Sequence, residues 1–438
     1  MLRTAYYAIA VPVAEGVARL ASFHRPKIRA ALKGRHEPRG WTGPEECIRL
    51  WFHVASLGEF EQAKPVIEAL QAGGPAAVWV SFFSPSGLEH AGSYAHAVDL
   101  FYLPFRRMAL RRAFEIIRPD AVITVRYDLW PGMAWEASRR RVPLLLVNAT
   151  LPERSPRNRL LLRHLQRSYY GHLSRVLAAT APDARRLRRL CGHGVSVEIT
   201  GDSRYDRVWA RAASSVSLGD LDTILGAASR PILVVGSTYE PEEHALAEAL
   251  SVMKESSGLS IVVVPHEPTE ERLAFAEALF NAAGWAPRRL SAMEPGQPWR
   301  MVLLDRVGVL AECYRHADFV MVGGSFKGKV HNVMEPAAWG KPVVVGPHYA
   351  NSPEGVGMVD CGAVVTVPDA AGLAAVVQGW IRDPAAAVRQ GSLARDFLLA
   401  RLGAAKRIAD AIEAEIGRHA PGRVRARHDH ASRISTDR

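Results

Sequence analysis

The chain has 438 residues, 48% of them hydrophobic, and a formal net charge of +11. A chain of this length is too long for one ordinary hydrophobic core, and its composition is that of a folded globular protein. Two or three domains are therefore predicted. No run approaches the roughly 18 apolar residues that span a bilayer, and four cysteines without a CxxC pair or metal-ligand spacing predict buried free thiols in a reducing compartment.

The first 40 residues are strongly basic. Eight arginines and lysines stand there against two acids, Glu15 and Glu37, and apolar residues are interleaved with them. Pro12 interrupts the apolar run 5–14, so a secretory signal is not expected. Residues 1–40 are predicted to be an amphipathic segment on an anionic membrane; the alternative is a helix packed on its own domain. No nucleic-acid-binding motif accompanies the charge, so no nucleic-acid partner is expected.

After this segment, strand and helix patterns alternate, which predicts parallel α/β sheets. The expected strands of the first half are 48–54, 77–83, 121–124, 144–147, 175–179 and 195–200, and the expected helices are 58–71, 104–118, 132–139 and 181–190. An Ala- and Ser-rich stretch follows at 211–220 and is typical of an interdomain linker.

The alternation then restarts. The expected strands are 231–236, 260–265, 301–304, 317–322, 342–345 and 363–367, and the expected helices are 241–254, 270–283, 309–316, 332–339, 370–402 and 404–416. The sequence therefore predicts two doubly wound Rossmann-like domains, at 41–210 and 221–418, joined by the linker. The charged tail 419–438 has no hydrophobic period and is expected to be disordered.

Polar residues follow the strands where ligands bind in such folds. After the first strand, Ser56 can cap the next helix, Gly58 permits a tight turn, and Glu59 stands in the helix's first turn. A carboxylate there can take a proton from a sugar hydroxyl if burial raises its pKa. The alternative is that Glu59 only complements the helix dipole.

Two further motifs end strands of the first half. Arg126 and Asp128 follow the strand at 121–124, and Arg204 follows the last strand, where it could stabilise a leaving phosphate. The alternatives are that Asp128 caps a helix before Pro131 and that Arg204 makes a salt bridge at the domain edge.

In the second half, Ser237 and Thr238 form a strand-to-helix turn with hydroxyls suited to phosphate, although the turn also suits plain capping. Pro265 and His266 follow the next strand, where the imidazole could contact a base or phosphate. A lone histidine is more often structural.

The most informative segment is the glycine-rich run from Val322 to His348. Its glycines allow close backbone approach to a ligand, and a helix expected to begin near 330–332 would aim N–H groups at an anion. The residues expected to bind a nucleotide-sugar in this run are Gly324, Ser325, Lys327, Lys329, Asn332 and Glu335, the last through ribose hydroxyls.

Taken together, these motifs resemble the 3-deoxy-D-manno-octulosonic acid (Kdo) transferases, which act in lipopolysaccharide synthesis. The resemblance covers nearly the whole chain. Its most specific pieces are 53–59, Val147-Asn-Ala-Thr with Glu153-Arg-Ser155, 201–206, 236–238, and 323–347 with Asn351.

The resemblance implies a GT-B fold with two Rossmann-like domains facing a central cleft, and inverting transfer of Kdo from CMP-Kdo to a lipid A precursor without a metal or other cofactor. The resemblance also implies that the enzyme acts at the cytoplasmic face of the inner membrane. Glu59 matches the family's base, Asp128 its second acid and Arg204 its phosphate-stabilising cation. Gly308, Pro265, His266, Asn332 and Glu335 match its cytidine-nucleotide contacts.

This sequence departs from the family pattern in five places. Arg126 and Asp128 stand where two glutamates are usual, and Arg204 replaces a lysine. Pro265-His266-Glu267 replaces Pro-Arg-His, Lys329-Val-His-Asn332 replaces Gly-Gly-His-Asn, and Gly308-Val309-Leu310 replaces Gly-Glu-Leu. We expect Lys329 to restore the charge lost at position 266.

Two alternatives remain open at this stage. One is a GT-B enzyme that uses another nucleotide sugar, because a fold does not fix its donor. The other is a non-catalytic, membrane-bound relative that binds nucleotide or lipid, although the presence of Glu59 argues against it.

Overall fold

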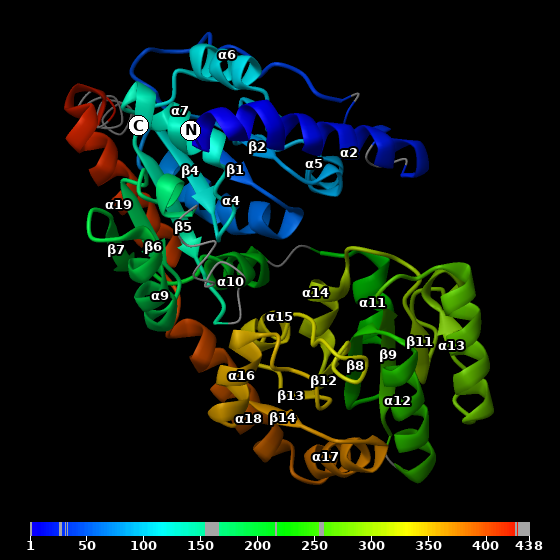
Figure 1. Cartoon of the computed structure of the whole chain (residues 1–438). Helices are drawn as coiled ribbons and strands as arrows, with labels where there is room; N and C mark the ends of the chain where they lie inside the picture. The colour runs from blue at the N-terminus through cyan, green and yellow to red at the C-terminus, as the bar shows by residue number, and fades with distance from the viewer. Residues whose placement is uncertain are drawn as a thin grey trace. The chain divides into compact units, whose positions relative to one another are not determined.

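The computed structural model describes residues 2–25, 29–30, 32, 34–153, 166–214, 217–253, 258–424 and 427. It contains two compact units, the first formed by Met1–Arg207 with Leu402–Arg438 and the second by Val208–Arg401. Figure 1 labels their elements. Arg154 and Ser155, quoted above for the family resemblance, lie outside the described residues.

The first unit is built on a seven-stranded parallel sheet in the order β3-β2-β1-β4-β5-β6-β7. Its strands are β1 (Ile48–Val54), β2 (Ala76–Phe82), β3 (Asp99–Tyr102), β4 (Ala121–Val125), β5 (Leu144–Ala149), β6 (Arg175–Ala178) and β7 (Ser196–Ile199). Ile48, Leu50 and Phe52 of β1 belong to one apolar cluster and Trp51 to another. Both faces of the sheet are therefore covered, as parallel sheets require.

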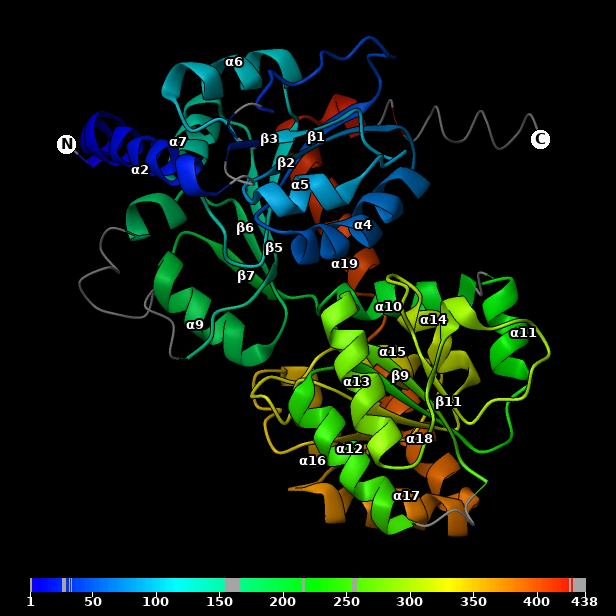
Figure 2. The ribbon, with the colours of Figure 1, turned by 90° about the vertical axis from the view of Figure 1, so that its right-hand side faces the viewer.

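Helices of this unit cover the two faces. They are α4 (Leu57–Ala72), α5 (Pro85–Ala91), α6 (Arg107–Ile117), α7 (Pro131–Arg140), α9 (Ala181–Cys191), the start of α10 (Arg204–Ser214), and α19 (Ala404–His419). Figure 2 shows α19 beside α4, against which it packs.

The N-terminus forms a continuous helical segment of α1 (Leu2–Ala5), η1 (Tyr6–Ala10) and α2 (Val11–His24). Tyr6 meets Trp135 of α7 edge to face, with ring centroids 5.3 Å apart, and Glu15 pairs with Arg106 at 2.7 Å. The segment also exposes a stripe of large apolar side chains at Ile9, Val13, Val17, Leu20 and Phe23. Among the described residues, no helix is both long and apolar enough to cross a membrane.

The second unit repeats the architecture, in the order β10-β11-β9-β8-β12-β13-β14. Its strands are β8 (Ile232–Thr238), β9 (Ser260–Pro265), β10 (Arg288–Arg289), β11 (Met301–Leu303), β12 (Phe319–Val322), β13 (Val343–Val345) and β14 (Val364–Thr366). Its helices are α11 (Asp220–Gly226), α12 (Glu240–Met253), α13 (Glu270–Ala282), η4 (Leu290–Ala292), α14 (Leu310–Cys313), η5 (Tyr314–His316), α15 (Met334–Ala338), α16 (Pro353–Asp360), α17 (Ala370–Arg382) and α18 (Pro384–Leu399).

The predicted fold class, doubly wound parallel sheets, is confirmed, and several details are corrected. β3, β10, α5, α10, α11 and α16 were not predicted. The single helix expected at 370–402 is two helices, because Asp383 caps a new one through the Ala386 N–H and Pro384 starts it. The expected linker at 211–220 contains the end of α10 and the start of α11, with residues 215 and 216 outside the described residues.

The C-terminus also differs from expectation. Helix α19 belongs to the first unit and not to a domain ending at residue 418, because Ile408, Ile412 and Ile416 are fully buried in the cluster that contains Ile48 of β1. In the tail expected to be disordered, Arg427 is fully buried and donates to the carbonyl oxygen of Leu70. Residues 425, 426 and 428–438 lie outside the described part of the chain.

Candidate active site

In the first unit, the strand order reverses direction between β1 and β4, which lie side by side. The carboxyl ends of two such strands form the crevice where doubly wound folds bind ligands. Ser56, Gly58 and Glu59 follow β1 at this point, and Arg126 and Asp128 follow β4. The structure therefore brings these five predicted site residues to one edge of the sheet.

Glu59 closes a reciprocal cap at the start of α4. The Glu59 N–H donates to Ser56 Oγ at 3.4 Å, and the Ala55 N–H donates to Glu59 Oε2 at 2.6 Å. The side chain is only 3% exposed. Burial raises the pKa of Glu59, the Asp128 charge raises it further, and the Ala55 hydrogen bond, Arg126 and His53 oppose the rise. Glu59 is therefore a capping carboxylate that is also poised to accept a proton.

Asp128 does not cap α7, because that helix begins at Pro131 with Trp130 as its uncapped N-terminal neighbour. Instead, Asp128 Oδ2 accepts the indole N–H of Trp130 at 3.3 Å and lies 3.8 Å from His53 Nε2. The carboxylate is thus held toward the end of β1, beside Glu59.

Arg126 has a strained backbone. Its φ of 64° is left-handed, a conformation that side chains other than glycine rarely adopt. Its N–H donates to the Val147 carbonyl oxygen at 2.9 Å, and its guanidinium lies 5.6 Å from the Tyr127 ring centroid. Strain of this kind is concentrated at functional sites.

Arg204 begins α10 and pairs with Asp202, whose Oδ2 lies 2.8 Å from an Arg204 terminal nitrogen and 2.9 Å from its Nε. Gln62 of α4 donates to the other Asp202 oxygen at 3.3 Å. The salt bridge considered as the alternative role of Arg204 is therefore present. The pair fixes the direction of this cation relative to α4, the helix that carries Glu59.

In the second unit, the strand order reverses between β8 and β12. Ser237 has a left-handed φ of 56° at an irregularity between β8 and β9. A Cβ on Gly323, which follows β12, would lie 2.3 Å from the Ser237 carbonyl oxygen, so only glycine fits there. The Thr238 hydroxyl donates to the Glu243 side chain of α12 at 2.7 Å.

The glycine-rich loop uses its backbone donors within the protein. Gly324 has a φ of 82°, and its carbonyl oxygen accepts the Gly328 and Lys329 N–H groups. The Phe326 and Lys327 N–H groups donate to Glu242 Oε1. The loop is therefore built around a carboxylate of the protein itself.

The helix after this loop is also shorter than expected. It begins at Met334 and has five residues, and Asn332 Oδ1 accepts the Met334 N–H at 3.0 Å. The Val330 N–H donates to Asn351 Oδ1 at 2.9 Å. The Val330 N–H also donates to the His348 carbonyl oxygen, and the His331 N–H donates to the Gly323 carbonyl oxygen. The free N–H groups expected at these two residues are therefore occupied. Ser325 Oγ accepts the Gly346 N–H at 2.7 Å and ties the loop to the strand β13.

Three rings stack at this edge of the second sheet. His331 lies 4.5 Å from His266 and 5.6 Å from Tyr239 between ring centroids, and Lys327 Nζ lies 3.8 Å from the Tyr239 centroid. Burial lowers the pKa of His331 to about 4, and His266 and Lys327 contribute to the decrease. His331 is therefore neutral near pH 7. The sequence interpretation missed Tyr239 and His331 as site residues, although both directly follow strand-end motifs. Lys329 is exposed.

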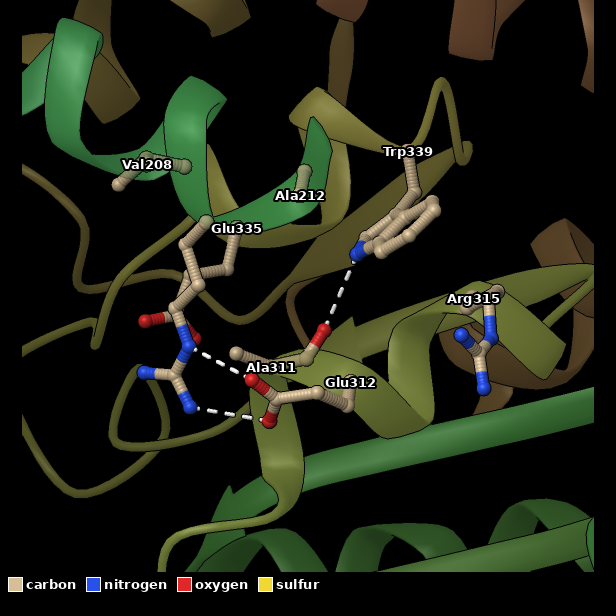
Figure 3. A pocket seen from close by; sticks show the side chains of 8 residues that line it. Val208, Ala212, Ala311, Glu312, Arg315, Glu335 and Trp339 are labelled. Carbon is tan, nitrogen blue, oxygen red and sulfur yellow. Dashed lines mark hydrogen bonds and ion pairs between the residues drawn. The ribbon is translucent and has the colours of Figure 1, made fainter. Parts of the chain in front are cut away.

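Glu335 lies in a small pocket of the second unit, shown in Figure 3. Burial raises the pKa of Glu335, opposed by the Arg211 charge and by a hydrogen bond with Asn332. Arg211 pairs with Glu312 at 2.7 Å and donates to the Gly308 carbonyl oxygen at 3.3 Å. Arg211 and Glu312, which the sequence did not predict, line this pocket with Glu335. Arg211 connects the pocket to Gly308, and Glu335 connects it to Asn332.

No group of three or more His, Cys, Asp or Glu side chains within the described ranges is arranged to hold a metal ion.

Comparisons with known proteins agree with these features. Residues 22–207 match the family model described as 3-deoxy-D-manno-octulosonic-acid transferase (kdotransferase). A 3-deoxy-D-manno-octulosonic acid transferase of Bordetella pertussis is 29% identical over 84% of this chain and 87% of its own length. One from Haemophilus influenzae is 27% identical over 91% of this chain and 95% of its own.

Among solved structures, UDP-GlcNAc 2-epimerase from Neisseria meningitidis bound to UDP-GlcNAc aligns with a TM-score of 0.63. The alignment covers 83% of this chain and 99% of that chain at 14% identity. At this identity the likeness concerns the fold alone, and it agrees with the predicted GT-B class.

Proposed function

The chain belongs to the Kdo transferase family, and from this premise we propose that it transfers Kdo from CMP-Kdo to a lipid A precursor with inversion at the anomeric carbon. The observation that carries the proposal is Glu59, a 3% exposed carboxyl group of raised pKa at the switch point of the first sheet. Enzymes raise the pKa of a glutamate in this way to obtain a general base that works near neutral pH.

In the proposed reaction, Glu59 takes the proton of an acceptor hydroxyl as its oxygen attacks the anomeric carbon of Kdo. CMP leaves from the opposite side of that carbon, so the configuration inverts. Ser56 and Gly58 shape the turn that presents Glu59, and Asp128 and Arg126 set its electrostatic surroundings.

The second unit is proposed to hold CMP-Kdo. Its fold supports this assignment, because β8 and β12 form the switch point where doubly wound sheets bind nucleotides. Glu335 would accept ribose hydroxyls, assisted by Asn332 and Gly308, and Pro265 and His266 would contact the nucleotide. Ser237, Thr238, Gly324 and Ser325 would line the site.

Cations are proposed to stabilise the leaving phosphate without a metal or another cofactor. Lys327 and Lys329 lie on the glycine-rich loop, and Arg204 is oriented by Asp202. Charge-assisted contacts of this kind stabilise developing negative charge.

The first unit is proposed to bind the acceptor at the cytoplasmic face of the inner membrane. The exposed apolar stripe of η1 and α2, with arginines beside it, has the pattern of an interfacial helix that binds anionic lipid. This stripe lies on the unit that carries Glu59.

The test combines purified protein, CMP-Kdo generated in situ and a lipid A precursor, with mass spectrometry of the products. Glu59→Gln is expected to fold normally and to lose transfer by at least ~10²-fold. Glu61→Gln is the matched control, since Glu61 lies on the same helix and pairs at the surface with Lys64 and Arg207. Turnover near the wild-type rate in Glu59→Gln would rule out this base.

The second candidate is a GT-B transferase with another donor, because a shared fold does not fix the donor. Calorimetry with CMP and UDP separates the two, because the proposed enzyme should bind CMP more tightly. Nucleotide or lipid binding without any turnover would instead indicate a non-catalytic relative.

A further inference from the structure

His53 is a fully buried histidine near the carboxyl end of β1, and the mechanism above does not use it. Its Nδ1 lies 3.1 Å from the carbonyl oxygen of Ser81 and 3.0 Å from Ser81 Oγ, both on the neighbouring strand β2. Ser81 Oγ also accepts the indole N–H of Trp51 at 2.9 Å. The contacts of Nδ1 with Ser81 therefore fix the orientation of the imidazole ring.

Two arrangements satisfy Nδ1. It donates to the Ser81 carbonyl oxygen, or it accepts the Ser81 hydroxyl. In both, Nε2 faces the other way, toward Asp128 Oδ2 at 3.8 Å.

Nε2 is buried and has no hydrogen-bond partner within the described part of the chain. An unprotonated Nε2 would place a lone pair opposite a carboxylate, which leaves a buried polar atom unsatisfied. A proton on Nε2 instead directs an N–H toward the Asp128 carboxylate. The geometry therefore favours a proton on Nε2.

We propose that His53 is a positioning residue for the transfer reaction: through a proton on Nε2 it holds Asp128 beside Glu59 and offsets the Asp128 charge. This inference rests on the proposed role of Glu59 as the base. Trp130 completes the arrangement, because its indole N–H donates to the same Asp128 oxygen.

Four charged or titratable groups meet here, from three elements. Glu59 comes from α4, His53 from β1, and Arg126 and Asp128 from the loop after β4. Asp128 raises the pKa of Glu59, whereas Arg126 and His53 lower it. Without His53, the pKa of Glu59 would therefore be higher.

Two substitutions separate the two sides of the imidazole. In His53→Asn, the side-chain amide takes the place of Nδ1 and can keep the contact with Ser81. No group then takes the place of Nε2 opposite Asp128. In His53→Gln, the amide replaces Nε2 and can still donate to Asp128. The acidic limb of kcat/KM is expected to move up by roughly half to one pH unit in His53→Asn, and to move less in His53→Gln. Identical profiles for wild type and His53→Asn would overturn the inference.

Nitrogen NMR of the His53 side chain in the full-length protein supplies a readout that does not depend on activity. Wild type should show a proton on Nε2, and the Nε2 signal should change in Asp128→Asn. A wild-type ring without a proton on Nε2 would overturn the inference. If Glu59 is not the base, Glu59→Gln will still transfer Kdo. That result is separate from the tests of His53.

Discussion

Glu242 of α12 accepts the backbone N–H of Phe326 at 2.7 Å, and the same oxygen accepts the Lys327 N–H at 3.1 Å. Its other oxygen accepts the Tyr239 N–H at 3.1 Å. Glu242 is fully buried, so one carboxylate connects the start of its own helix to the glycine-rich loop after β12. The position of Lys327 over the Tyr239 ring follows from these bonds.

Substituting Glu242 should release this loop. Glu242→Ala leaves three backbone donors without their acceptor and is expected to cost about 2 kcal/mol or more in the free energy of unfolding. CMP affinity should fall and amide hydrogen exchange at Phe326 and Lys327 should accelerate, as measured by calorimetry and exchange mass spectrometry. Glu240→Ala removes an exposed acid that pairs with Arg272 and is the control. Unchanged exchange at both amides would contradict the role of Glu242.

The Arg211–Glu312 pair should control the ionisation of Glu335. Arg211 lowers the pKa of Glu335 against the effect of burial, so Arg211→Met should raise that pKa further. If ionised Glu335 binds ribose, the loss of CMP affinity on acidification should begin at a higher pH in the variant. Calorimetry over a pH series checks this. Arg230→Met, which breaks the surface pair with Asp318, should leave the profile unchanged.

The docking of α19 should contribute strongly to the stability of the first unit. Ile412 is fully buried among residues of that unit, so Ile412→Ala is expected to destabilise it by about 3 kcal/mol through lost burial and a cavity. Met108→Ala, at a side chain that is 72% exposed, should have little effect. Urea unfolding measures both variants, and equal stabilities would place α19 outside the folding core.

The apolar stripe of α2 should mediate membrane binding. Replacing Val17 and Leu20 with Glu introduces charge into exposed apolar positions and should weaken sedimentation with anionic liposomes by roughly tenfold or more. Met108→Glu adds a charge at another exposed apolar side chain of the same unit and is the control. Equal loss in both variants would indicate a general charge effect and not a specific surface.

The sequence predicted much of the fold because apolar runs of β-branched residues mark buried parallel strands. β1 and β9 lie at their expected positions for this reason. β10 has only two residues, Arg288 and Arg289, and has no apolar pattern to detect. Its pairing with β11 exists only because that strand supplies the hydrogen-bond partners.

The glycine-rich segment from Val322 to His348 likewise has features that the sequence predicts and features that depend on tertiary structure. Its residues alone placed a tight loop between two buried strands, because glycine permits conformations such as the φ of 82° at Gly324. That Glu242 occupies the loop's N–H groups, and that His331 stacks on His266, depended on elements distant in the chain.

Sequence by itself therefore determined the fold class, the family and the strand ends that carry polar residues, because each is encoded in local patterns. Tertiary structure decided which unit α19 joins, where Asp128 points and which charges set the pKa of Glu59. Those outcomes depend on burial and on distances of a few ångströms between groups from different strands and helices. No local pattern specifies such distances, since they arise only when the sheet brings β1 and β4 side by side.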